Sequence, residues 1–183
     1  MFLSANTQWM DQLDQAGLLV KGSRRALLGN RLALIAHSNR ETMVDLAQAA
    51  SLLAALEGTP LVMADPAHVP AGIYTREALE SLSLWNPLQG RLAFVASARA
   101  VSVQIARGET PLGITYASEL KGQSALQAAA HIPAEAYSPI RYELALVAPD
   151  DDPVARAFYE YLFTEEALAV FAEHGFTRGN QDT

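Results

Sequence analysis

Residues 59–84 constrain the fold most, because they predict a buried strand, a broken loop and a helix in direct succession. The apolar run Leu61–Ala64 predicts the strand, and Asp65-Pro66 ends it because proline cannot continue a central strand. Apolar residues then recur at helical spacing, after Pro70 at a position that helix starts tolerate. The small pair Ala71-Gly72 leaves the free N–H groups of the first turn open, and the helix dipole there favours an anion. Taken alone, this pattern favours an ordinary connection that binds nothing.

The composition limits what kind of ligand the chain can hold. Half of the 183 residues are hydrophobic and 18% are charged, which is typical of a folded globular protein. The net charge of −7 argues against a nucleic-acid or anionic membrane surface, so no nucleic-acid partner is expected. An anion site would therefore depend on local N–H and hydroxyl dipoles. The absence of cysteine excludes disulfides and thiolate metal sites.

Predicted strands alternate with predicted helices through most of the chain, which indicates an α/β layered sheet with largely parallel strands. The pattern leaves residues 125–132 open between a strand and a mixed segment. The expected strands are 2–5, 32–36, 61–64, 92–95, 112–116 and 143–148. The expected helices are 7–16, 23–28, 45–56, 71–84, 98–107, 154–162 and 165–174.

Three strand-to-helix junctions are candidates for a common binding site. In open α/β sheets ligands lie beyond the carboxyl ends of strands, where such junctions meet. If they converge, they offer the Ala71 N–H, the Ala98 N–H and the Tyr116 hydroxyl to one small ligand. All three are neutral donors, which suits a fully ionised oxyanion that has no proton to donate.

The motif Asp-Pro-x-His-Val-Pro-Ala-Gly-x-Tyr, residues 65–74, resembles the signature of the periplasmic molybdate-binding proteins of ABC importers, the ModA family. The resemblance implies a two-lobed fold of the periplasmic-binding-protein type II class. It also implies capture of molybdate or tungstate for a membrane permease, with no enzymatic activity, no cofactor and no metal bound except as the oxyanion. In that family the oxyanion is held by N–H groups at two helix starts, a tyrosine hydroxyl and two serines. The corresponding residues here are Ala71, Ala98 and Tyr116, the last within Pro-Leu-Gly-Ile-x-Tyr-x-Ser; Ser97-Ala98 stands where the family usually has an acidic residue and then valine.

The resemblance extends over essentially the whole chain and predicts its domains. It assigns residues 1–30 and 146–183 to a first lobe and 31–145 to a complete second lobe, with the interlobe crossing strands at its ends. The segments that precede Met1 in the family, a signal peptide and two strand–helix units with both serine ligands, have no match here. We therefore expect a truncated first lobe, impaired binding, and an exposed sheet edge that favours dimerisation. The family is periplasmic, whereas no signal peptide is recognisable in this sequence.

Other interpretations remain open at this point. The chain could be the effector-sensing domain of a transcription regulator with the same fold, a binder of another tetrahedral oxyanion, or a small α/β enzyme, although no acid, base or nucleophile is identifiable. His68 is expected to order its loop, and Arg99 to form an ion pair at least as readily as it contacts an anion. The four histidines lack metal-ligand spacing, and Asp150–Asp152 predict a solvated turn with a helix cap.

Overall fold

The computed structural model describes residues 1–149 and 152–179, and its contacts divide the chain into two compact units. Unit 1 comprises residues 1–30 and 139–183, and unit 2 comprises residues 31–138. The expected second lobe extended to residue 145. In the structure β8 (Arg141–Ala145) pairs with strands of unit 1. Unit 2 therefore ends at residue 138.

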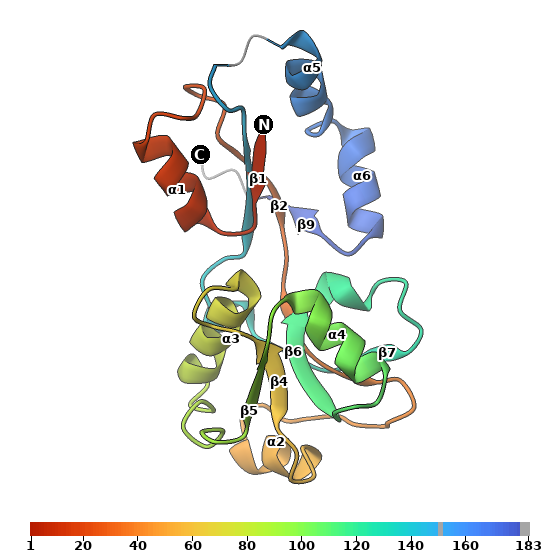
Figure 1. The fold of residues 1–183 in the computed structure, drawn as a ribbon. Helices are drawn as coiled ribbons and strands as arrows, with labels where there is room; N and C mark the ends of the chain where they lie inside the picture. The colour runs from red at the N-terminus through yellow and green to blue at the C-terminus, as the bar shows by residue number, and fades with distance from the viewer. Residues whose placement is uncertain (150–151, 180–183) are drawn as a thin grey trace. The chain divides into compact units, whose positions relative to one another are not determined.

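Unit 2 is built on a five-stranded sheet in the order β5-β4-β6-β3-β7 (Figure 1). Its strands are β3 (Leu32–His37), β4 (Leu61–Ala64), β5 (Leu92–Val95), β6 (Leu112–Tyr116) and β7 (Leu126–His131). Its helices are α2 (Ala49–Ala55), α3 (Pro70–Ser81) and α4 (Ala98–Ala106), with 3-10 turns η1 (Ala117–Leu120) and η2 (Ala134–Ala136). The segment 125–132, which the pattern left open, thus contains a strand.

The expectation of largely parallel strands was wrong. Among the described strands only β4–β5 and β4–β6 pair in parallel; β3 pairs antiparallel with both β6 and β7, and unit 1 is antiparallel throughout. The alternation of helices and strands along a chain does not determine which strands become neighbours, and β3 reaches the sheet between two strands that run opposite to it.

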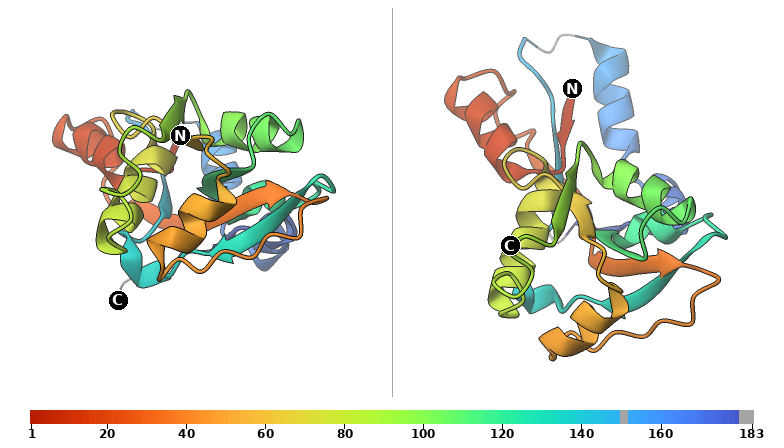
Figure 2. Two further views of the ribbon diagram at one scale, coloured as in Figure 1. Left: turned by 90° about the horizontal axis from the view of Figure 1, so that it is seen from below. Right: turned by 60° about the horizontal axis from the view of Figure 1, so that its bottom comes forward.

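The core of unit 2 lies where α4 packs against the sheet, next to β6 and β3 (Figures 1 and 2). Val101 and Ile105 of α4 are fully buried together with Ile35 and Val62 of the sheet. α3 packs against β4 and β6. Since β3 and β4 carry buried residues at successive positions, they are enclosed on both faces.

Unit 1 contains a four-stranded sheet in the order β1-β8-β2-β9, with β1 at an edge. Its strands are β1 (Phe2–Ser4), β2 (Arg25–Gly29), β8 and β9 (Thr177–Arg178), and its helices are α1 (Thr7–Gln15), α5 (Pro153–Tyr161) and α6 (Glu165–Glu173). Leu27 and Leu144 form its core with Tyr159 of α5. The side chains of Asn6 and Asp152 cap the N-termini of α1 and α5 by accepting hydrogen bonds from backbone N–H groups of the first turn. Asp150 and Asp151 lie outside the described residues.

The short helix expected over residues 23–28 is instead the strand β2. Its backbone pairs with β8 on one side and β9 on the other. A segment this short gains little from its own helical hydrogen bonds, so partners distant in the sequence decide its conformation. Ser23 stays outside the strand, where its hydroxyl accepts a hydrogen bond from the Leu146 N–H at 3.0 Å.

Candidate functional site

The three strands that precede the predicted site residues lie side by side and parallel. β4 is flanked by β5 and β6, with Ala64 opposite Val95 and Met63 opposite Ile114. One further hydrogen bond, from the Asp65 N–H to the Val95 carbonyl at 2.9 Å, extends this pairing past the end of β4. The carboxyl ends of all three strands therefore meet at one edge of the unit 2 sheet.

The α3 helix presents an N–H group at this edge. Val69 is the N-cap and supplies no side-chain cap, while its carbonyl accepts hydrogen bonds from the N–H groups of Gly72 and Ile73 at 2.9 and 3.0 Å. Pro70 has no N–H group. Within the described part of the chain, no recorded hydrogen bond uses the Ala71 N–H. The first turn is held in place by the buried Thr75, whose hydroxyl donates to the Ala71 carbonyl at 2.7 Å.

Gly72 explains how α3 starts so close to the strand. A Cβ atom at this position would lie 2.3 Å from the Ala64 carbonyl oxygen and 2.6 Å from the Asp65 carbonyl carbon. Both are main-chain atoms that cannot rotate away. Glycine is therefore required here by the close approach of two backbones, which fixes the position of the neighbouring Ala71 N–H relative to the end of β4.

The α4 helix starts beside the end of β6. Ser97 is the N-cap and accepts a hydrogen bond from the Ala100 N–H at 3.1 Å. The buried Thr115 of β6 donates its hydroxyl to the Ala98 carbonyl at 3.1 Å, which ties the first residue of α4 to the neighbour of Tyr116. The hydrogen bonds recorded between described residues leave the Ala98 N–H unused.

Tyr116 is the last residue of β6 and its side chain is 8% exposed. It lies opposite Leu32 of β3, and the next N–H group, of Ala117, donates to the Arg31 carbonyl at 2.7 Å. The structure thus brings the elements carrying Ala71, Ala98 and Tyr116 to one sheet edge. Their role as ligand-binding groups stays a prediction.

The charged residues near this edge are paired with each other. Arg99 of α4 forms an ion pair with Glu119 of η1 at 3.0 Å, one of the two roles expected for it. His68 lies 3.8 Å from the Asp65 carboxylate, and that carboxylate also accepts a hydrogen bond from the Ala67 N–H. The N–H groups of Ala71 and Ala98, by contrast, are neutral donors at the same edge.

The described residues contain no group of three or more side chains that could hold a metal ion. In residues 1–149 and 152–179, no helix combines the length and the hydropathy that crossing a bilayer requires.

Sequence reasoning missed two residues that position the site, Thr75 and Thr115. Both are polar and fully buried, and each donates to the carbonyl of a predicted site residue. The available signal was a threonine within an otherwise apolar strand or helix face, because a buried hydroxyl needs an acceptor.

The comparisons with known proteins agree with this architecture. A family model described as bacterial extracellular solute-binding protein matches residues 1–177. The molybdate-binding protein ModA of Haemophilus influenzae is 35% identical over 178 residues, which cover 97% of this chain and 70% of that protein. ModA of Escherichia coli is 32% identical over 180 residues, covering 97% and 69%. An aconitate isomerase of a Pseudomonas species is 27% identical over 155 residues, covering 74% of this chain and 58% of that enzyme.

A solved structure gives the same result for the fold. The substrate-binding domain of a putative molybdenum ABC transporter from Clostridium difficile superposes with a TM-score of 0.81 at 25% identity, covering 98% of this chain and 76% of that one. The predicted fold class, that of the periplasmic binding proteins, is confirmed. With a family match over residues 1–177 and relatives above 30% identity, the chain belongs to the ModA family of bacterial extracellular solute-binding proteins.

Proposed function

We propose that the chain is a solute-binding protein that captures molybdate or tungstate for an ABC importer in the periplasm, and that it is not an enzyme. The observation that carries this proposal is the pair of unused N–H groups, of Ala71 and Ala98, at the starts of two helices on one sheet edge. N–H groups at helix starts, with the helix dipoles behind them, attract an anion. The relatives named for molybdate binding point to the same class of ligand.

The chemistry of these donors favours an oxyanion that carries no proton. The two N–H groups and the Tyr116 hydroxyl can donate, and the nearby Glu119 carboxylate is already engaged by Arg99 at 3.0 Å. A protonated oxyanion would keep an O–H group without an acceptor, which is costly in a water-excluded site. We therefore propose selection of a fully ionised tetrahedral anion, without any cofactor.

The proposed site offers three hydrogen-bond donors, the N–H groups of Ala71 and Ala98 and the Tyr116 hydroxyl. Each hydrogen bond to a charged group is worth roughly 1.5–3 kcal/mol. We therefore propose that these hydrogen bonds supply most of the affinity for molybdate. Isothermal titration with molybdate, with sulfate as the competing tetrahedral anion, tests this. Saturable, molybdate-selective heat supports the proposal; equal binding of sulfate would favour a binder of another oxyanion, and no heat with either anion would contradict it.

The N–H group of Ala98 can be removed by a proline substitution that leaves the packing of α4 intact. Ala98 is the first residue of α4, a position that accepts proline, and Ser97 before it is already extended at φ −163° and ψ 162°. Ala98→Pro therefore deletes one N–H group while the helix start is kept. Thr7→Pro is the matched control, because Thr7 is the first residue of α1 in unit 1 and also follows an extended residue. We expect Ala98→Pro to weaken molybdate binding about tenfold or more and Thr7→Pro to leave it unchanged.

The tyrosine can be tested in the same way. Tyr116→Phe removes only the hydroxyl and should weaken binding by a similar factor, whereas Tyr161→Phe at an exposed position of α5 should not. Parent-like affinity in both Ala98→Pro and Tyr116→Phe would place the ligand elsewhere and refute the proposed site.

We also propose that unit 1 self-associates. Nine of the eleven large hydrophobic side chains exposed among the described residues belong to unit 1, including Leu3 on the edge strand β1, which is 47% exposed. An unpaired edge with apolar side chains can pair with a second copy. Light scattering coupled to size exclusion should give twice the monomer mass, and Leu3→Lys should give a monomer; a monomeric parent would contradict this proposal.

A further inference from the structure

An ion pair at the sheet edge of unit 2 joins two of the elements that carry the proposed donors. Arg99 is the second residue of α4 and directly follows Ala98. Glu119 lies in the 3-10 turn η1, which directly follows Tyr116. The Arg99 guanidinium donates a hydrogen bond to the Glu119 carboxylate at 3.0 Å. One member of the pair is therefore anchored next to a proposed N–H donor, and the other is anchored close to the proposed hydroxyl donor.

The pair is held more firmly than an ordinary ion pair on a protein surface. The Glu119 side chain is only 20% exposed. Gln123, just beyond η1, adds a second acceptor for Arg99. With the Gln123 amide oriented so that its oxygen faces the guanidinium, that oxygen accepts hydrogen bonds from both Nη atoms of Arg99 at 3.2 Å. A carboxylate and an amide oxygen thus fix the guanidinium beside η1, and two charge-assisted acceptors outweigh the single solvated contact of most surface pairs.

Each member of the pair would change the choice of ligand if the other were absent. Side chains of a helix lean toward its N-terminus, so an unheld Arg99 would reach toward an anion bound at the Ala98 N–H group. Its long side chain has many rotamers and would follow anions of different size. An unheld Glu119 carboxylate would accept the O–H group of a protonated oxyanion and would repel a fully ionised one. Within the pair, each group is occupied by the other.

We propose that the Arg99–Glu119 pair is a specificity determinant of the oxyanion site, an inference that rests on the proposed function. By engaging each other, the cation and the carboxylate leave ligand selection to the N–H and hydroxyl donors. Because backbone donors have fixed positions, they discriminate between anions by size. The site therefore prefers molybdate or tungstate to the smaller sulfate, and it also prefers them to an oxyanion that keeps a proton.

Titrations with molybdate, sulfate and phosphate at mildly alkaline pH test this inference, with the Ala98 amide resonance as the readout. Phosphate represents the protonated oxyanions, because its dianion keeps one proton. Glu119→Gln leaves the Arg99 charge uncompensated, so sulfate should bind about tenfold more tightly. The preference for molybdate over sulfate should fall, and the affinity for both anions should become strongly dependent on salt.

Two further variants separate specificity from support of the fold. Arg99→Gln leaves Glu119 uncompensated and should weaken molybdate binding about tenfold, while phosphate gains relative to molybdate. The double variant Arg99→Gln/Glu119→Gln carries neither charge and should return to the specificity and salt dependence of the parent. If the pair only holds α4 against η1, all three variants will weaken all three anions by a common factor, and that result would overturn the inference.

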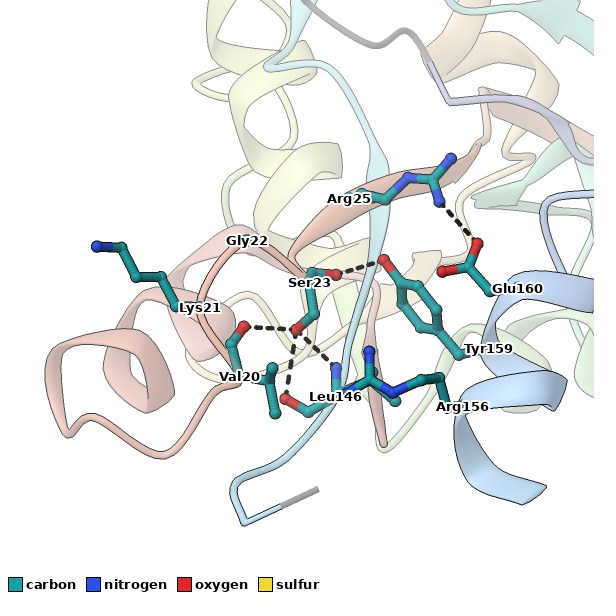
Figure 3. Close-up of a pocket in the computed structure, with 9 residues that line it drawn as sticks. All are labelled: Val20, Lys21, Gly22, Ser23, Arg25, Leu146, Arg156, Tyr159 and Glu160. Carbon is teal, nitrogen blue, oxygen red and sulfur yellow. Dashed lines mark hydrogen bonds and ion pairs between the residues drawn. The ribbon is translucent and has the colours of Figure 1, made fainter. Parts of the chain in front are cut away.

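Two control variants remove the same charge from other ion pairs of arginine and glutamate. Glu80→Gln acts in the last turn of α3, where Glu80 accepts a hydrogen bond from Arg76 at 2.8 Å. Glu160→Gln acts in unit 1, where Figure 3 shows the Glu160 carboxylate facing the Arg25 guanidinium, at 3.5 Å. Both controls should keep the specificity of the parent. If they change it as Glu119→Gln does, net charge sets the specificity and the inference is wrong.

The same titrations distinguish a failure of this inference from a failure of the proposed function. If the parent binds molybdate and Glu119→Gln binds all three anions as the parent does, the function stands and the inference fails. If the parent shows no saturable shift with any anion, the proposed function fails. A saturable sulfate shift at Ala98 that appears only in Glu119→Gln would then still support a cation withheld by Glu119, and its absence would refute that as well.

Discussion

Replacing Gly72 by alanine tests whether the approach of α3 to β4 positions the candidate site. Glycine within a helix normally costs about 1 kcal/mol relative to alanine, so propensity alone predicts that Gly72→Ala stabilises the protein. The structure predicts the opposite. A Cβ atom here would lie 2.3 Å from the Ala64 carbonyl oxygen, and an ordinary contact begins at 3.4 Å. The helix start must therefore move by about 1 Å.

The expected magnitude follows from these opposing terms. Forcing an extra carbon into a packed region costs typically 1–3 kcal/mol, and more where main-chain atoms must move. Subtracting the propensity gain leaves a net loss of roughly 1–2 kcal/mol for unit 2. With a urea dependence of about 2 kcal/mol/M, the unfolding midpoint should fall by roughly 0.5–1 M. The displaced Ala71 N–H should also weaken oxyanion binding.

Urea unfolding followed by Trp85 fluorescence in a Trp9→Phe background reports on unit 2, because Trp85 lies just after α3. Ser81→Ala is the matched control: Ser81 is an exposed residue of the same helix, and there the propensity gain should appear as a small stabilisation. If Gly72→Ala matches or exceeds the parent midpoint, the close backbone approach does not exist and the geometry assigned to the Ala71 N–H is wrong.

Three further perturbations probe the supporting structure. Arg24→Met should destabilise unit 1 by about 2 kcal/mol in urea unfolding, because Glu143, 12% exposed, loses a partner at 2.7 Å. Gly113→Ala places a Cβ atom 2.6 Å from the Val101 side chain of α4 and should lower the urea unfolding midpoint of unit 2. An unchanged midpoint would mean that α4 moves away from β6 at little cost. Arg178 lowers the pKa of Glu165 below 4.5 in the folded state, so the folded chain binds fewer protons than the unfolded chain. The resulting stability is complete above pH 4.5 and is lost as the pH falls through the folded-state pKa. Arg178→Gln should remove this acid sensitivity, so that the unfolding midpoints of parent and variant converge as the pH falls below 4.5.

The parts of the site that sequence reasoning predicted are those encoded locally. The strand at residues 61–64, the proline at the start of α3 and the serine cap before Ala98 are each specified by a few adjacent residues, and the structure has all three. Side-chain caps and proline act on the backbone within two or three residues of themselves. Their consequences therefore do not depend on the rest of the fold.

Interactions between distant segments could not be predicted in this way. The strand β2 and its neighbours β8 and β9 lie more than 100 residues apart in the sequence, and nothing in the Arg25–Gly29 segment identifies these partners. The contact of Thr115 with the Ala98 carbonyl likewise needs the packing of α4 beside β6 to be known first. Hydrophobic periodicity and secondary-structure propensity describe one segment at a time. They therefore do not determine the order or the direction of the strands in a sheet.

The sheet edge of unit 2 must attract an anion on an acidic chain. Its donors are neutral N–H and hydroxyl groups, whose favourable fields act only within the first turn of each helix. The net charge of −7 repels the anion over a longer range, and salt screens that repulsion over about 8 Å at physiological ionic strength. Raising the salt concentration should therefore weaken molybdate binding less than it would at a site built on charged side chains. A steep loss of molybdate affinity with salt would mean that charge, rather than fixed dipoles, governs the sheet edge.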